Sequence, residues 1–95
     1  MIKKQELKDG TVKVTFELEH LEEADKVQLL GDFNDWTPET MKKYKNGKHK
    51  STVNLDPGNT YQFRYLVDGE RWENDDEADR LLPTEFGVEN SAVVC

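Results

Sequence analysis

The chain has 95 residues, of which 35% are charged and 35% hydrophobic, and its formal net charge is −7. This length allows one domain, residues 1–95, and excludes a catalytic barrel, which needs about 250 residues. A negative surface repels phosphate backbones and anionic lipid headgroups, so we expect neither nucleic acid nor a membrane as partner. A neutral ligand is not affected by this charge.

No residue pattern at the N-terminus resembles a signal peptide, and no apolar run approaches the length of a membrane span. We therefore expect a cytoplasmic protein. The only cysteine, Cys95, has no partner for an intramolecular disulfide. His20 and His49 stand apart from other ligand residues, so the sequence predicts no metal and no cofactor.

The first structural pattern is the alternation of apolar and polar residues along 12–18 (VKVTFEL). It predicts a strand with one buried and one solvent-exposed face. After a polar break, apolar residues resume at Val27 and Leu29 and end at GDFNDW, residues 31–36. This motif places Trp36 at the end of a polar turn that water can reach.

Two turn signals follow in the middle of the chain. The Asn-Gly pair in KNGK (45–48) suits a type I′ hairpin turn, in which both central residues have positive φ. In DPGN (56–59), proline occupies a turn position whose φ it already fixes. We expect strands at 49–55 and at 60–68, on either side of the second turn.

The clearest strand, 60–68, has one apolar face made of Tyr61, Phe63, Tyr65 and Val67, and an opposite face made of Gln62, Arg64 and Leu66. If 68–70 is a three-residue hairpin loop, Leu66 pairs with Trp72 and both lie on the face away from the core. A two-residue loop would instead pair Trp72 with Tyr65 and bury it. Gly69 permits the left-handed conformation of three-residue loops, which favours the exposed register.

The last third of the chain has weaker signals. Residues 74–82 (NDDEADRLL) suit one helical turn, with Ala78, Leu81 and Leu82 at helical spacing, and residues 90–94 suit a final short strand. About seven short strands joined by turns predict an all-β protein, an antiparallel β-sandwich.

An exposed Trp72 beside Arg64 and Leu66 suits a sugar. An indole face stacks on the C–H face of a pyranose ring, while guanidinium and carboxamide groups such as those of Arg64 and Asn90 bind its hydroxyls. The alternative is that both tryptophans are core residues, which is the commoner place for this residue. On that interpretation Arg64 is a solvated strand residue and Asn90 belongs to a turn.

Five motifs, in this order, resemble the glycogen-binding domain family: VQLLGDFNDW, NG, LDPG, YQFRYLVDGERW and FGVENSAVV. The family is also described as carbohydrate-binding module family 48 or the isoamylase N-terminal domain. It occurs in the β subunit of AMP-activated protein kinase and in glycogen branching and debranching enzymes. The resemblance covers roughly residues 12–95 and implies an immunoglobulin-like, early-set sandwich that binds α-1,4-linked glucans such as glycogen, starch and maltooligosaccharides.

The resemblance also implies a binding site. The two tryptophans, the basic strand residue, the apolar residue before the late glycine and the asparagine after it match Trp36, Trp72, Arg64, Phe86 and Asn90. We expect Leu66 to add a contact. One departure from the family is Asp76, where many relatives have proline, and it bears on the shape of the 74–84 loop.

The expected function is therefore a non-catalytic glucan-binding module. In family enzymes the domain precedes a catalytic barrel, whereas this chain ends, so we expect it to act alone or with a glycogen-metabolising enzyme or kinase in trans. The alternative is a protein-interaction module that kept the fold and lost sugar binding. A glycosidase is disfavoured, because it needs two carboxylates flanking a cleft, and a small sandwich offers Asp68, Asp75, Asp76 and Glu77 little cleft.

Overall fold

The structure, a computed structural model, describes all 95 residues and is built from ten strands and one 3-10 turn in two antiparallel sheets. The first sheet has the strand order β1-β2-β6-β5, and its strands are β1 (Ile2–Glu6), β2 (Val12–Leu18), β6 (His49–Leu55) and β5 (Lys42–Lys43). The second sheet has the order β4-β3-β7-β10-β9, with β8 paired to β7. Its strands are β4 (Glu39–Thr40), β3 (Val27–Gly31), β7 (Thr60–Val67), β10 (Glu89–Val94), β9 (Arg80–Pro83) and β8 (Arg71–Glu73), and the 3-10 turn η1 (Asp32–Asn34) follows β3.

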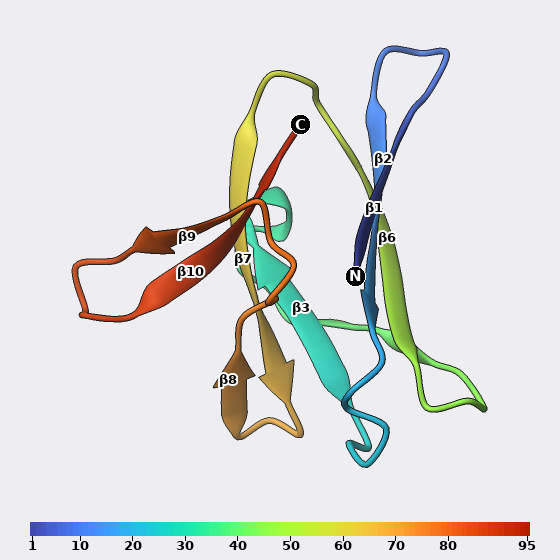
Figure 1. Cartoon of the computed structure of the whole chain (residues 1–95), viewed down its shortest axis with the longest axis vertical. Coiled ribbons are helices and arrows are strands. Elements are labelled where there is room, and N and C mark those ends of the chain that lie inside the picture. Colours follow the sequence, from blue (N-terminus) through green and yellow to red (C-terminus); the bar gives the residue numbers. More distant parts are fainter.

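The two sheets face each other as the layers of a sandwich, with β2 and β6 in one layer and β3 and β7 in the other (Figure 1). The all-β prediction is confirmed, and the strands that the sequence patterns did not identify are β1, β4, β5 and β9. None of the helical segments has the length and apolar character that crossing a bilayer requires.

The core lies between the sheets and is made by the alternation read from the sequence. Phe16 of β2 and Phe63 of β7 are fully buried and meet edge to face, with ring centroids 4.9 Å apart. Phe63 in turn packs edge to face on Tyr65, at 5.6 Å. Such aromatic pairs stabilise a sandwich beyond the area they bury, and they leave the alternate residues of β7 on the outer face of the second sheet.

One residue on the supposedly solvent-exposed face of β2 is buried. Glu17 is only 3% exposed, because the Lys48 ammonium lies 3.2 Å from its carboxylate and Lys50 lies 3.7 Å from it. Burial alone would raise the pKa of Glu17, but the hydrogen bond from Lys48 and the neighbouring lysine charges outweigh it and lower the pKa. The carboxylate is therefore charged at neutral pH and holds two lysines on the outer face of the first sheet.

The two predicted hairpin loops have different outcomes. The prediction of a type I′ turn at KNGK is wrong, because only Gly47 has positive φ (+84°) and its N–H donates to the Tyr44 carbonyl, 3.0 Å away. This is a three-residue loop that closes on a glycine. The predicted loop at 68–70 is confirmed, because Leu66 pairs with Trp72, and Gly69 has a φ of +70°.

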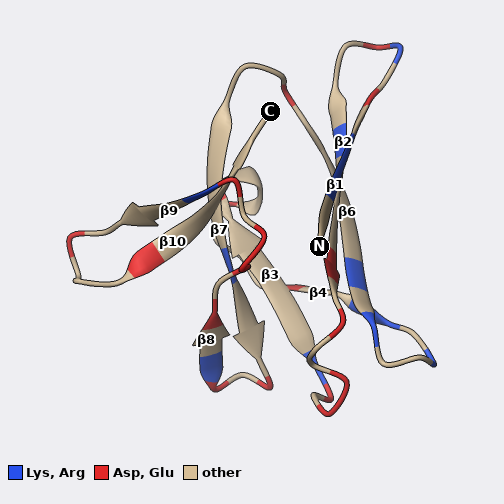
Figure 2. Cartoon of the chain, viewed as in Figure 1, with Lys and Arg blue, Asp and Glu red and all other residues tan.

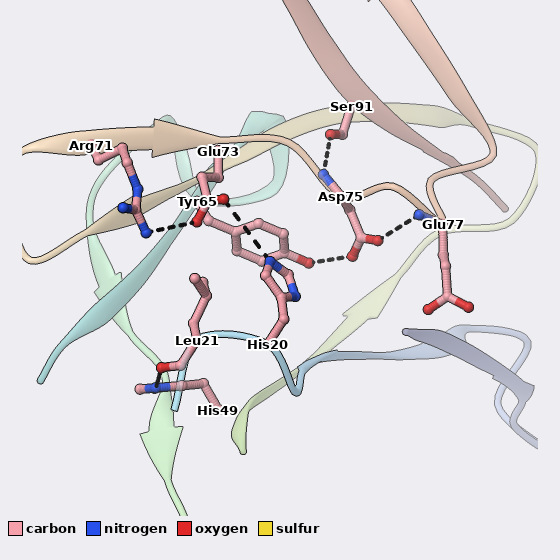
Figure 3. Close-up of polar contacts among 9 residues, drawn as sticks. All are labelled: His20, Leu21, His49, Tyr65, Arg71, Glu73, Asp75, Glu77 and Ser91. Carbon is pink, nitrogen blue, oxygen red and sulfur yellow. Dashed lines mark hydrogen bonds and ion pairs between the residues drawn. The ribbon is translucent and has the colours of Figure 1, made fainter. Parts of the chain in front are cut away.

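The prediction of a helical segment at 74–82 is wrong, because residues 75–78 form only one hydrogen-bonded turn, with the Ala78 N–H donating to the Asp75 carbonyl at 3.2 Å, before β9 begins at Arg80. Asp75 is buried, its carboxylate accepts a hydrogen bond from the Tyr65 hydroxyl (2.7 Å), and its N–H donates to the Ser91 hydroxyl (2.8 Å), as Figure 3 shows. Burial and the adjacent Asp75 raise the pKa of Tyr65, which keeps it a neutral donor. With the chain fixed there, residues 80–83 pair with β10 instead of coiling.

Candidate functional site

The outer face of the second sheet carries a hollow of about 720 Å³. It is lined by Trp36, Gln62, Arg64, Trp72, Pro83, Thr84, Glu85, Phe86, Val88 and Asn90. Five of the six site residues predicted from the sequence thus lie around one hollow. The sixth, Leu66, is half-buried between Gln28 of β3 and Trp72 of β8 and does not line it.

The indole of Trp36 is held in place by the polar residues that precede it. Asp32 accepts a hydrogen bond from Trp36 Nε1 (3.0 Å) through one carboxylate oxygen and from the Gln62 N–H (2.8 Å) through the other. Asn34 closes the 3-10 turn by accepting from the Gly31 N–H at 2.9 Å. One carboxylate therefore ties the tryptophan to β7, which forms the floor of the hollow.

Backbone conformation at the end of this motif is also unusual. Asp35 and Trp36 have φ values of +54° and +57°, in the left-handed region that non-glycine residues seldom adopt. Residues are held there only where surrounding contacts fix them. The Trp36 N–H supplies one such contact, donating to the Gly31 carbonyl at 2.9 Å. The strained turn directs Trp36 toward the hollow.

Gly31 is needed for close packing rather than for its φ, which is extended at −168°. A Cβ at this position would lie 2.8 Å from the Gln62 carbonyl oxygen and 2.8 Å from two ring carbons of Phe33. Backbone and aromatic ring therefore approach too closely for any side chain. This contact seats the motif against β7.

Trp72 and Arg64 form the second part of the site. The Arg64 guanidinium carbon lies 5.8 Å from the centroid of the Trp72 ring, within the range of a cation–π contact, and Trp72 is 48% exposed. Arg64 makes no ion pair and no side-chain hydrogen bond, and its buried Nε has no partner. A guanidinium with five donors is thus held over the hollow without a protein acceptor.

A pair of carboxamides lies beside Arg64. Asn90 Nδ2 donates to Gln62 Oε1 at 3.0 Å, which leaves the Gln62 amide N–H groups and the Asn90 carbonyl oxygen for other partners. Gln62 was not among the predicted site residues. Strand alternation nevertheless puts it on the same face of β7 as Arg64, opposite the buried Phe63. The signal that would have found it is therefore the strand alternation itself.

The remaining wall of the hollow is the hairpin loop between β9 and β10. Thr84 fixes its base, because its N–H and hydroxyl both donate to the Val88 carbonyl at 2.8 Å, and Gly87 has a φ of +78°. Phe86 lies at the tip and is 82% exposed. An exposed phenyl ring on a closed hairpin is an apolar surface available to a ligand.

The acids weighed as catalytic candidates lie outside the hollow. Asp68 accepts hydrogen bonds from the N–H groups of Asp25 and Lys26, at 2.9 and 2.8 Å. The carboxylates of Asp75, Asp76 and Glu77 lie within 4.8 Å of one another, but Asp75 is engaged by Tyr65 and by the Glu77 N–H. These contacts shape loops, as Figure 3 shows for Asp75.

The chain matches a known protein family over most of its length. The family described as the glycogen recognition site of AMP-activated protein kinase matches residues 12–91. The chain belongs to this family of carbohydrate-binding modules. No curated protein sequence matches it.

Among solved structures, an apo pullulanase from Paenibacillus barengoltzii is similar to 86% of the chain, with 26% sequence identity and a TM-score of 0.51. The matched part is 14% of that pullulanase chain, so this module spans a small fraction of the enzyme. Both comparisons support carbohydrate binding and the early-set sandwich fold.

Proposed function

We propose that this module binds α-1,4-linked glucans, such as glycogen, starch and maltooligosaccharides, without chemical change. The observation that carries the proposal is the Arg64 guanidinium, which lies without an acceptor beside the exposed Trp72 in a hollow that Trp36 also lines. Two indole faces offer stacking surfaces for glucose rings. The Arg64 guanidinium offers N–H groups that can donate hydrogen bonds to the hydroxyl oxygens of the sugar.

Each remaining residue has a distinct part in this proposal. Asn90 and Gln62 use their free amide groups for ring hydroxyls, because their mutual hydrogen bond satisfies only one donor and one acceptor. Phe86 supports the apolar side of a glucan from the hairpin tip. Leu66 acts indirectly, since it backs Trp72 across the β7–β8 pair.

The expected affinity is modest. The hollow lies on an open sheet face, so a glucan keeps part of its hydration and makes few hydrogen bonds. We expect dissociation constants of about 10 μM to 1 mM for short oligosaccharides, which corresponds to roughly 4 to 7 kcal/mol.

The hollow does not suit glycoside hydrolysis. Hydrolysis requires two carboxyl groups on either side of the scissile bond, and Glu85 is the only acidic residue that lines the hollow. We therefore propose a binding module that serves a glucan-acting enzyme or a kinase in the cytoplasm, in keeping with the family description and the pullulanase similarity. Incubation with amylose should release no reducing ends.

Titration with maltoheptaose, followed by tryptophan fluorescence and calorimetry, tests the proposal. Trp36→Ala and Trp72→Ala should each lower the affinity at least about tenfold, equivalent to ~1.4 kcal/mol. Tyr44→Ala is the matched control, since it removes an aromatic that is 40% exposed on the first sheet. A β-1,4-linked glucan of similar length should bind much more weakly.

Two results would contradict the proposal. Unchanged affinity in both tryptophan variants would remove the hollow as the binding site. The other is that the folded wild-type protein does not bind maltoheptaose at about 10 mM, well above the expected dissociation constants. This result would favour an interaction module that has lost sugar binding.

A further inference from the structure

Charge is strongly segregated between the two sheets. Residues 1–18 and 42–55, which form the first sheet and its hairpin turns, contain nine of the ten lysines and only three acidic residues, a side-chain charge of +6. All other residues together contain four cationic and seventeen acidic side chains, a charge of −13. In Figure 2 the lysines accordingly mark β1, β2, β6 and the adjacent hairpin, while acidic residues mark the loops of the second sheet.

Strand alternation puts the central part of this charge on the outer face of the first sheet. Lys13 alternates with the buried Val12 and Val14, and Lys50 alternates with the buried His49. Lys3 is paired with Thr15 and Lys42 with Lys50, which puts both on the same side. We call the surface formed by Lys3, Lys13, Lys42, Lys48 and Lys50 the lysine face.

The lysine face also carries two paired threonines and an exposed aromatic residue. Thr15 and Thr52 are paired across β2 and β6, with their hydroxyl oxygens 3.4 Å apart. Beside them Tyr44 is 40% exposed, with the Lys42 and Lys50 ammonium groups 5.1 and 5.5 Å from its ring centroid. Tyrosine is enriched at protein-binding surfaces whereas lysine is depleted there, so the charge of this face, more than its composition, selects the partner.

The carboxylates on this face neutralise only part of its charge. Glu17 is shared by Lys48 and Lys50, and Glu19 contacts Lys48 at 3.2 Å. Lys3, Lys13 and Lys42 make no ion pair. Since like charges held close together repel, this arrangement is relieved when an anion lies across them.

Protection of sheet edges does not explain the pattern. Lysines on edge strands prevent unwanted strand pairing, and β1 and β5 are the edges of the first sheet. Lys13 and Lys50, however, lie on the interior strands β2 and β6. These two lysines therefore do not protect an exposed strand edge.

We propose that the lysine face docks an acidic segment of a partner protein. Acidic residues flank the lysine face and restrict the size of an anionic partner. Glu6 and Asp9 lie at or beside the β1–β2 turn, and Glu19 and Glu22 follow β2. These flanking carboxylates repel the phosphates of a larger duplex or bilayer, and such repulsion reaches about 8 Å, the screening length at physiological salt. A short acidic segment fits between them.

This docking surface is separate from the glucan hollow, because the two lie on the outer faces of opposite sheets. A glucan and a protein partner can therefore be bound at the same time. The inference rests on charge and strand pairing alone, so it stands or falls independently of sugar binding.

The test is fluorescence anisotropy with a labelled dodecaglutamate peptide at low salt. The triple variant K3E/K13E/K42E reverses three face lysines that make no ion pair. The matched control K26E/R71E/R80E has the same net charge but places its reversals off the face. We expect the first to weaken peptide binding at least about tenfold and the control less than about threefold. Circular dichroism and thermal unfolding establish that both variants are folded.

Three outcomes would overturn the proposal. One is that the wild-type protein does not bind the peptide at low salt. Another is that both triple variants weaken binding equally, since net charge alone would then explain it. The third is that phosphatidylserine vesicles or duplex DNA bind more tightly than the peptide, which would assign the face to a membrane or to nucleic acid.

Discussion

The two outer faces of the sandwich are built by the same alternation of side chains, yet they offer different chemistry. The face of the second sheet is hollowed, and it sets the unpaired guanidinium of Arg64 beside Trp72 in a hollow that Trp36 also lines. The face of the first sheet has Thr15 and Thr52 paired across its interior strands and carries a cluster of lysines.

This contrast shows how one small fold separates two kinds of recognition. Stacking and neutral hydrogen bonds act only at contact distance, so the hollow depends on the exact placement of Trp36 and Trp72. Coulombic attraction acts over several ångströms and depends on the number of charges, so the lysine face tolerates changes in shape. Variants in the hollow should therefore lose glucan binding, whereas variants of the lysine face should lose peptide binding.

The largest effect is expected from Gly31→Ala. Its Cβ would lie 2.8 Å from the Gln62 carbonyl oxygen and from the Phe33 ring, so β3 or the ring must move. Overpacking of this kind costs about 1–3 kcal/mol, and a loss of 1 kcal/mol lowers the Tm of a domain this size by about 4–8 °C. Thermal unfolding measures the cost. An unchanged Tm together with unchanged maltoheptaose affinity would show that the motif is not tightly seated.

Asp32→Ala should have a smaller and more selective effect. It frees the Trp36 indole and leaves the Gln62 N–H without its acceptor. We expect glucan affinity to fall by about threefold to tenfold, because a lost hydrogen bond to a charged group costs about 1.5–3 kcal/mol and part of that cost falls on folding. Asp32→Asn, which keeps one acceptor oxygen, should recover part of the affinity. Peptide binding at the lysine face should not change in either variant.

Glu17→Gln tests whether the lysine face is organised by its buried carboxylate. The pKa of Glu17 is lowered in the folded state from its ordinary value of 4.5, so its contribution to stability is present above that value and is lost as the pH falls through the folded-state pKa. The wild type should therefore be more stable than the variant at neutral pH, with the difference disappearing in acid below the lowered pKa of Glu17. Denaturant unfolding at both pH values measures it. A difference that persists in acid would assign the effect to packing.

The smallest effect is expected from salt on glucan binding. Raising the salt from about 50 to 500 mM screens exposed charges but leaves stacking on a neutral ligand intact. The dissociation constant for maltoheptaose should change less than about twofold, while peptide binding at the lysine face should weaken at least about tenfold. Equal salt dependence at both sites would remove the distinction between the two faces.

Sequence patterns predicted the parts of the fold that depend on local alternation. The pairing of Leu66 with Trp72 followed from the length of the 68–70 loop, and the burial of Phe16 and Phe63 followed from their period of two. Short strands such as β4 and β5 were missed, since two residues carry no period and pair only because a neighbouring strand is present.

The features that sequence patterns predicted wrongly or did not predict depend on contacts between residues far apart in the sequence. The 74–82 segment has helical spacing, but Tyr65 and Ser91 hold Asp75 and determine its path. Glu17 has the alternation of an exposed residue, yet lysines more than thirty positions away bury it. For the hollow, the motif named Trp36 and Trp72, whereas Gln62 was placed on the face of Arg64 by strand alternation but was not recognised as a site residue until the structure showed that it lines the hollow.

The most direct test of the glucan site is an NMR titration of the two indole N–H signals with maltoheptaose. Both signals should shift with one dissociation constant of about 10 μM to 1 mM, because Trp36 and Trp72 line a single hollow. Indole signals that stay in place while the sugar binds elsewhere, or when it does not bind at all, would contradict the account.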